Sequence, residues 1–243
     1  VTYSFNVYDY DTLTTKLDSA TAVTEGTDTT SWQVTATLPD NGQYFWTVST
    51  NDGYEESAVS DAGSFLLNTD NNPPEMFTLS MPLVNTAVQS LSPVFSWHPA
   101  SDPDPIDTVH YMLMLDTPDP GVIVFEVGTD TSFQVPDPLM DNTQYYWQVI
   151  AEDLLGFQTI SEGGYQTFYT NIENDPPTAS TLVAPLNESI QTDLMPNFYW
   201  TESLDPDPMD HISYTMHWWP MGVLPVIYST DTDSNSFSPE DNL

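Results

Sequence analysis

Hydrophobic and polar residues alternate over several short stretches of this 243-residue chain. The clearest stretch is 144–152, where Tyr145, Trp147, Val149 and Ala151 occupy every second position. Because successive side chains of an extended strand point to opposite faces, these side chains are predicted to share one buried face of a strand. Turn-forming Pro, Gly, Asn and Asp interrupt the alternation, which favours short strands over helices.

The same reading, applied to the middle of the chain, predicts a set of seven short strands separated by turns. Their predicted ranges are 77–81, 94–98, 109–116, 122–127, 132–135, 144–152 and 165–170. Seven strands at this spacing are typical of a β-sandwich, so the sequence predicts an all-β fold.

One acidic stretch occurs twice, first at residues 101–111 and again at 204–214. Each copy follows a Trp, contains three Asp and leads into a predicted strand. A repeat period of about 100 residues indicates tandem modules, each of which is large enough for its own core.

Alignment on this repeat predicts three modules with different contents. Residues 74–172 form a complete module. Residues 1–70 correspond to the back part of a module, without its first two strands, and residues 176–243 correspond to the front part, without its last two. We interpret the chain as a window of a longer array, in which neighbouring modules or identical chains complete the open sheets and half-cores at the ends.

The predicted linkers, 70–74 and 173–177, both end in two consecutive prolines. Paired prolines restrict the backbone and remove two hydrogen-bond donors, so these joints should be short and stiff. The sequence therefore predicts a rod of modules.

Several repeated motifs together resemble the fibronectin type III-like repeats of large secreted and cell-surface proteins of bacteria and archaea. The motifs that carry the resemblance are Phe95-Ser-Trp97, the acidic stretch 101–111, Leu139 with Tyr145, 146–151, 153–156 and 168–170. The resemblance implies tandem immunoglobulin-like seven-stranded β-sandwiches and an extracellular or cell-surface location. The spacings of Leu38 to Tyr44 and of Leu139 to Tyr145 resemble the tyrosine corner of such sandwiches. Where many such repeats read Asp-Pro-Asp-Gly-Asp, this chain reads Asp-Pro-Asp-Pro-Ile-Asp and Asp-Pro-Asp-Pro-Met-Asp.

The charge balance narrows the possible partners. The chain has one basic side chain of the Lys or Arg type, 36 acidic side chains and a formal charge of -35. Electrostatics therefore oppose binding to nucleic acid or anionic lipid, and cations are the expected partners.

No apolar run reaches membrane-spanning length, so we expect no direct membrane insertion of this segment. The chain contains no Cys, which excludes disulfides and thiol chemistry.

The acidic repeat is the strongest candidate for a metal site. Crowded carboxylates repel one another, and a hard cation such as calcium, which takes six to eight oxygen ligands, would relieve the repulsion. In the resembled fold the linker before a module and the loop after its sixth strand lie at the same pole, so they can contribute to the site. The predicted ligands are Asp102, Asp104, Asp107, Asp153 and Asn72 at one site, and Asp205, Asp207, Asp210 and Asp175 at the other. The alternative is that Asp and Pro are there only because they form good turns.

The tryptophans divide into two groups. Trp46, Trp97, Trp147 and Trp200 fall on predicted inward faces and are expected in cores. Trp218 and Trp219 are adjacent, so one of the two should point outward from a strand, where it would stack on a sugar ring or be covered by the following loop.

Taken together, these features predict a non-catalytic structural segment of an extracellular stalk or fibre, with calcium at the module junctions. The absence of Arg, the near absence of Lys and the lack of a nucleophile with its base argue against an enzyme. The alternative function is a glycan- or protein-binding region of an adhesin or of a secreted enzyme, with Trp218 or Trp219 in contact with the ligand.

Overall fold

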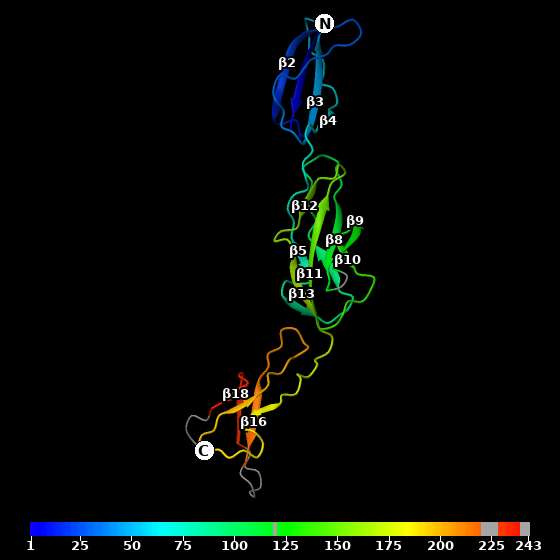
Figure 1. The fold of residues 1–243 in the computed structure, drawn as a ribbon. Helices are drawn as coiled ribbons and strands as arrows, with labels where there is room; N and C mark the ends of the chain where they lie inside the picture. The colour runs from blue at the N-terminus through cyan, green and yellow to red at the C-terminus, as the bar shows by residue number, and fades with distance from the viewer. Residues whose placement is uncertain (119–120, 220–227, 239–243) are drawn as a thin grey trace.

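The computed structural model of the chain describes residues 1–118, 121–219 and 228–238, and every regular element in them is a β-strand. Figure 1 shows three sheet-containing segments that follow one another from the N-terminus. We refer to residues 1–70, 74–172 and 176–238 as the N-terminal, central and C-terminal segments. Within the described residues there is no helix that could cross a membrane.

The central segment contains two sheets. One has the strand order β10-β7-β5, and the other has the order β6-β13-β11-β8-β9 with β12 paired to β11. Their bounds are β5 (Leu79–Met81), β6 (Thr86–Val88), β7 (Val94–Trp97), β8 (His110–Asp116), β9 (Val122–Gly128), β10 (Ser132–Gln134), β11 (Thr143–Glu152), β12 (Gln158–Ile160) and β13 (Gln166–Thr170). All pairs are antiparallel except β6 with β13.

The seven strands predicted for this segment are present, with ends that shift by no more than two residues. Strands β6 and β12 are additions to the predicted set. Each has three residues, and a stretch of that length contains too little alternation to be recognised from sequence.

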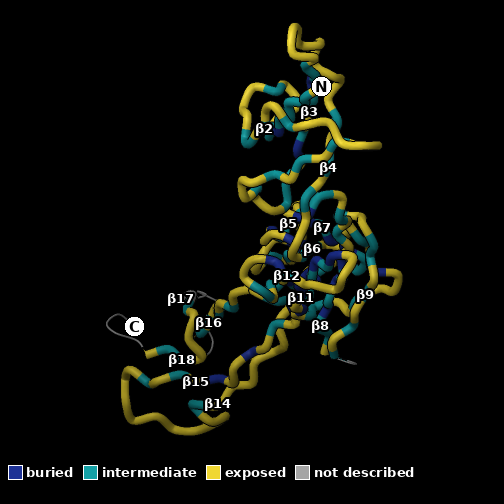
Figure 2. Tube along the Cα trace, turned by 90° about the horizontal axis from the view of Figure 1, so that it is seen from above, coloured by how far each residue is buried: buried dark blue, intermediate teal, exposed yellow. Residues whose placement is uncertain are grey.

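A single aromatic-rich core lies between the two sheets of the central segment. The buried face predicted for β11 is confirmed, because Tyr145, Trp147, Val149 and Ala151 are all buried. Phe95 of the opposite sheet packs edge-on against Trp147, with ring centroids 5.0 Å apart. Figure 2 shows that the buried residues of the chain are concentrated in this segment.

The N-terminal segment contains one sheet, with the strand order β2-β1-β3-β4. Its strands are β1 (Thr2–Tyr8), β2 (Lys16–Thr24), β3 (Gly42–Asn51) and β4 (Gly63–Leu67). This order corresponds to β9-β8-β11-β13 of the central segment. Within the described residues, no strands equivalent to β5 and β7 lie over this sheet.

The prediction that Trp46 lies in a core is therefore wrong. Its side chain is 41% exposed, whereas the aligned Trp147 is 0% exposed. The residue that covers Trp147 is Phe95 of β7, and the described part of the N-terminal segment has no equivalent strand. Trp97, Trp147 and Trp200 are buried, as predicted.

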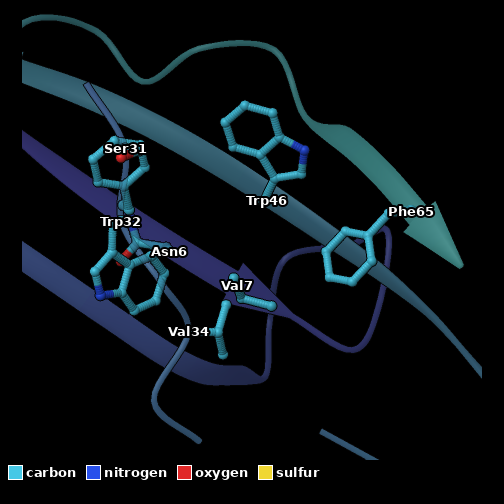
Figure 3. Close-up of a pocket in the computed structure, with 8 residues that line it drawn as sticks. Asn6, Val7, Ser31, Trp32, Val34, Trp46 and Phe65 are labelled. Carbon is cyan, nitrogen blue, oxygen red and sulfur yellow. The ribbon is translucent and has the colours of Figure 1, made fainter. Parts of the chain in front are cut away.

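An open apolar groove of about 340 Å³ lies on the uncovered sheet beside Trp46 (Figure 3). Its lining residues are Phe5, Asn6, Val7, Ser31, Trp32, Val34, Trp46 and Phe65. Residues 31–34 align with β10 but form no strand. In the central segment β10 is held by β7, so the missing partner explains the irregular backbone.

The C-terminal segment has equivalents of β5, β7 and β10, which the described residues of the N-terminal segment lack, and of β8 and β9, which both end segments contain. Its sheets have the orders β14-β15-β18 and β16-β17, which correspond to β5-β7-β10 and β8-β9. The strands are β14 (Leu182–Ala184), β15 (Phe198–Trp200), β16 (Tyr214–Trp218), β17 (Tyr228–Thr232) and β18 (Ser236–Phe237). Trp200 packs against Tyr214, with ring centroids 5.6 Å apart.

Candidate metal centres

The first acidic loop runs from the end of β7 to the start of β8 and is fixed at its entry by a core tyrosine. The hydroxyl of Tyr111 accepts a hydrogen bond of 2.8 Å from the backbone N–H of Ala100. Inside the loop, the N–H of Asp104 donates to Asp102 Oδ1 at 2.9 Å. Ile106 adopts a left-handed φ of 66°, which reverses the chain and is unusual for a β-branched residue.

This turn brings three carboxylates together. Asp102, Asp104 and Asp107 each have an oxygen within 4.8 Å of those of the other two. Asp104 is only 3% exposed. Asp104 Oδ1 and Asp102 Oδ2 are buried and accept no hydrogen bond from any described residue. Buried acceptors without a donor are costly, so the loop concentrates negative charge that the described residues do not fully compensate.

The loop after β11 lies beside this cluster, as the sequence predicted. The N–H of Leu154 donates to Asp107 Oδ1 at 3.3 Å. Asp153 is buried, and its Oδ1 accepts hydrogen bonds from Leu155 and Phe157 of its own loop. Its Oδ2 accepts a bond of 2.7 Å from the side chain of Asn71. Asp153 therefore already has donors on both oxygens.

The linker before the central segment contacts the same cluster through Asn72. Its backbone N–H donates to Asp104 Oδ2 at 2.8 Å, while its side-chain Oδ1 accepts a bond of 2.7 Å from Asn41 Nδ2. Asn41 belongs to the turn that precedes β3 in the N-terminal segment. A continuous set of contacts therefore runs from Asn41 through Asn72 to Asp104, across the joint between two segments.

The turn that carries Asn41 is itself held against the linker. Asp40 accepts hydrogen bonds from the backbone N–H groups of Thr69 and Asp70 and from the Thr69 hydroxyl, at 2.7, 3.2 and 2.8 Å. The hydroxyl of Tyr44 donates to the carbonyl of Pro39, which closes the turn on its other side. Contacts between protein groups alone therefore fix the position of Asn41.

The second joint repeats this arrangement. Asn142 Nδ2 donates to Asp175 Oδ2 at 2.9 Å, and the N–H of Asp175 donates to Asp207 Oδ2 at 2.6 Å. Asp207 is 3% exposed, and its Oδ1 is buried without a donor among the described residues. Asp205 and Asp210 complete a cluster with the same 4.8 Å limit. The two joints, which have repeated sequences, therefore share the same chain of contacts.

The surroundings of the two clusters differ at two positions. The first has Asp153 close by, whereas the described part of the C-terminal segment has no strand equivalent to β11 and so no counterpart of Asp153. The second cluster instead has Asp175 where the first has Asn72. Each joint therefore gathers four carboxylates.

Sequence reasoning missed Asn41 and Asn142, which precede the strands β3 and β11. The signal was present, because the motif Leu-x-Asp-Asn-x-x-Tyr occurs at both 38–44 and 139–145. The Leu and Tyr of this motif indicate a tyrosine corner, but nothing local gives its Asn a role. Only the joint geometry places these amides against the next segment's linker.

Two carboxyl groups at the first joint, those of Asp102 and Asp153, have pKa values that are shifted in opposite directions. Burial raises the pKa of the Asp102 carboxyl above its ordinary value of 3.8; the bond from the Asp104 N–H opposes this shift, and the charges of the nearby carboxylates add to it. Burial also acts to raise the pKa of Asp153. There, however, the bonds from Asn71 and from the backbone of its own loop outweigh burial and leave the pKa below 3.8.

A pH dependence follows from the raised pKa of Asp102. In calcium-free buffer, the folded chain takes up a proton at Asp102 at a higher pH than the unfolded chain does, so this residue adds stability as pH falls from its folded-state pKa toward 3.8. Asp102→Asn should remove this gain, so the variant's melting temperature should rise less than the parent's, or fall more, between pH 7 and about pH 4. Parallel curves would contradict the prediction.

The lowered pKa of Asp153 acts with the opposite sign, so it provides an internal comparison. The stability that its ionised form contributes is present above 3.8 and is lost as pH falls through the lower folded-state pKa. Asp153→Asn should therefore lower the melting temperature mainly at neutral pH. As the pH is lowered, the melting temperature of this variant should fall less than the parent's, in contrast to Asp102→Asn.

The two adjacent tryptophans at the end of β16 lie apart from these clusters in the sequence. The Trp218 ring contacts Phe237 at a centroid distance of 5.9 Å, and Trp219 is 61% exposed. Residues 220–227, which follow them, lie outside the described residues, and so does the predicted cover of an outward Trp by these residues. Glycan binding by Trp218 or Trp219 stays a prediction.

Comparisons with known proteins give little beyond the geometry. No family model matches the chain, and no curated protein matches it. Among solved structures, the chain is similar to the FN1-FN3 domains of chicken CNTN1, with a TM-score of 0.37 and 13% sequence identity. The similarity covers 98% of this chain and 78% of that chain.

Proposed function

We propose that the chain is a non-catalytic structural segment of an extracellular or cell-surface stalk or fibre, in which fibronectin type III-like modules are joined stiffly and calcium braces each joint. The observation that carries this proposal is the repeated contact from Asn41 through Asn72 to Asp104, and from Asn142 through Asp175 to Asp207. A hydrogen-bond network that is repeated at both joints suits a mechanical connection between segments better than it suits catalysis.

The chemical nature of the cluster supports calcium as the cation. The available donors are carboxylate and amide oxygens, which are hard ligands, and the described clusters contain neither His nor Cys. Calcium accepts six to eight oxygens in irregular geometry, whereas magnesium requires a near-ideal octahedron. A loop whose shape is set by fixed Pro turns favours the more tolerant ion.

Charge gives a second reason for a bound cation. The chain has a formal charge of -35, and Oδ1 of Asp104 and Oδ1 of Asp207 are buried without donors among the described residues. A divalent ion at each joint would offset local repulsion where solvent is partly excluded. Calcium would then hold the joint rigid, and its removal would leave the carboxylates of each cluster repelling one another beside the joint.

Calcium titration of the full chain tests this proposal. We expect two calcium ions to bind per chain, with dissociation constants of about 10⁻⁴–10⁻³ M, as in extracellular modules. At 100 times the dissociation constant, the stabilisation should be about 2.7 kcal/mol for each occupied site. Calorimetric titration gives the stoichiometry, and small-angle scattering should show a longer, less variable particle with calcium than with chelator.

Variants assign each ion to a joint. Asp104→Ala and Asp207→Ala should each remove one bound calcium, and the double variant should remove both. Asp130→Ala is the control, because Asp130 is exposed in the turn between β9 and β10 and belongs to neither cluster. A parent chain with no calcium-dependent change in melting temperature would refute the proposal.

A further inference from the structure

We propose that each cation site takes a ligand from the segment before the joint, namely Asn41 Oδ1 at the first joint and Asn142 Oδ1 at the second. This inference rests on the proposed function, since it concerns the same two sites. Under this proposal, calcium is bound by residues of two segments and not by one loop alone, so each site is complete only when the two segments are docked.

The first observation is that these amide oxygens have no partner. Asn41 Oδ1 and Asn142 Oδ1 are both buried, and neither accepts a hydrogen bond from any described residue. The other end of each amide is engaged, since Nδ2 donates to Asn72 or to Asp175. With the amide orientation set by that bond, the oxygen is the atom left to bind an ion.

The second observation is the placement of the two amides. Asn72 and Asp175, which these amides contact, also donate their backbone N–H to Asp104 and Asp207. Both of those carboxylates are 3% exposed and keep one oxygen without a donor among the described residues. At each joint, a side chain from each of two segments therefore contacts the same linker residue, and each of these side chains has one oxygen without a donor among the described residues.

The backbone explains why the residue at this position is an asparagine. Asn41 and Asn142 have φ values of 58° and 48°, in the left-handed region. Asn is among the few residues other than Gly that adopt this region readily, and it also supplies an uncharged oxygen ligand. Gly would satisfy the backbone alone but would lose both side-chain atoms.

The consequence is reciprocal coupling between calcium and docking. If one ligand comes from each side of the joint, calcium binds tightly only when the two segments are docked, and docking is favoured by the same free energy. Calcium concentration would thus set the stiffness of the chain at both joints.

The test is made in the full chain with the second site removed by Asp207→Ala. In this background Asn41→Ala should weaken calcium binding to the first site by about tenfold, the lower end of the effect of losing a supporting metal contact. Asn41→Asp should retain or increase the affinity, because a carboxylate oxygen replaces the amide oxygen. Calorimetric titration with calcium chloride measures both. Asn85→Ala in the same background is the matched control, because Asn85 has a similar left-handed φ of 55° but belongs to neither site, and it should change nothing.

The Asn41→Asp variant separates a ligand from a merely positioning residue. If Asn41 acted only by donating Nδ2 to Asn72, the Asp variant would lose affinity as the Ala variant does, and the inference would be overturned. Unchanged affinity in Asn41→Ala would overturn it as well. Absence of calcium binding in the parent would instead refute the proposed function, so the two failures are distinguishable. Circular dichroism in chelator checks that each variant is folded.

Discussion

Trp147→Ala is expected to destabilise the central segment by about 3–5 kcal/mol, the usual cost of removing a large aromatic side chain from a packed core. Trp147 is 0% exposed, and Phe95 packs edge-on against it from the opposite sheet. The cavity left by this substitution lies between two sheets that cannot collapse easily. The expected loss is therefore a large fraction of the stability of one small module.

The matched control for this prediction is the same substitution at the aligned position of the N-terminal segment. Trp46 is 41% exposed beside an open groove (Figure 3), so Trp46→Ala removes far less buried surface and should cost less than half as much. Because the chain has several segments, a single unfolding curve is not sufficient. Hydrogen exchange of the β11 and β3 amides gives a separate stability for each segment, and equal losses would contradict the prediction.

Asp104→Asn should change the stability of the chain in opposite directions with and without calcium. In chelator the substitution removes a buried charge from a cluster of carboxylates. The new Oδ1 still accepts the N–H of Asn72, and the new amide N–H₂ donates to a neighbouring carboxylate. We expect a gain of about 1–2 kcal/mol, on the scale of satisfying one buried polar group.

In saturating calcium the order should reverse. The parent gains about 2.7 kcal/mol at 100 times its dissociation constant, whereas Asp104→Asn lacks the carboxylate on which this gain depends. Melting temperatures in both buffers measure the crossover. Asp130→Asn, which changes an exposed acid outside the clusters, should stay within about 0.5 kcal/mol of the parent in both. A lower stability of Asp104→Asn in both buffers would show that the carboxylate serves the fold alone.

The alternation of residues was sufficient to predict most strands of the central segment. Side-chain direction in a strand is a property of the local backbone, so Tyr145, Trp147, Val149 and Ala151 can be assigned to one face without knowledge of the fold. The acidic loops were also predictable, because turn-forming Asp and Pro recur at the same spacing in both copies. These features depend on residues that are close in sequence.

What the sequence could not decide was what lies opposite each residue. Trp46 and Trp147 follow the same local pattern, yet only Trp147 is covered, because its cover comes from β7, some fifty residues away along the chain. In the same way, Asp40-Asn41 reads locally as a turn. Its contact with Asn72 exists only because the linker folds back against that turn.

The sequence by itself therefore determined most strands of the central segment, the repeat and the acidic loops around Asp104 and Asp207, since these follow from backbone geometry and turn chemistry. The tertiary structure decided that Trp46 is exposed and that Asn41 and Asn142 meet the next segment's linker. Burial and ligand sets are made by side chains from distant parts of the chain, so they become visible only when the sheets and joints are assembled.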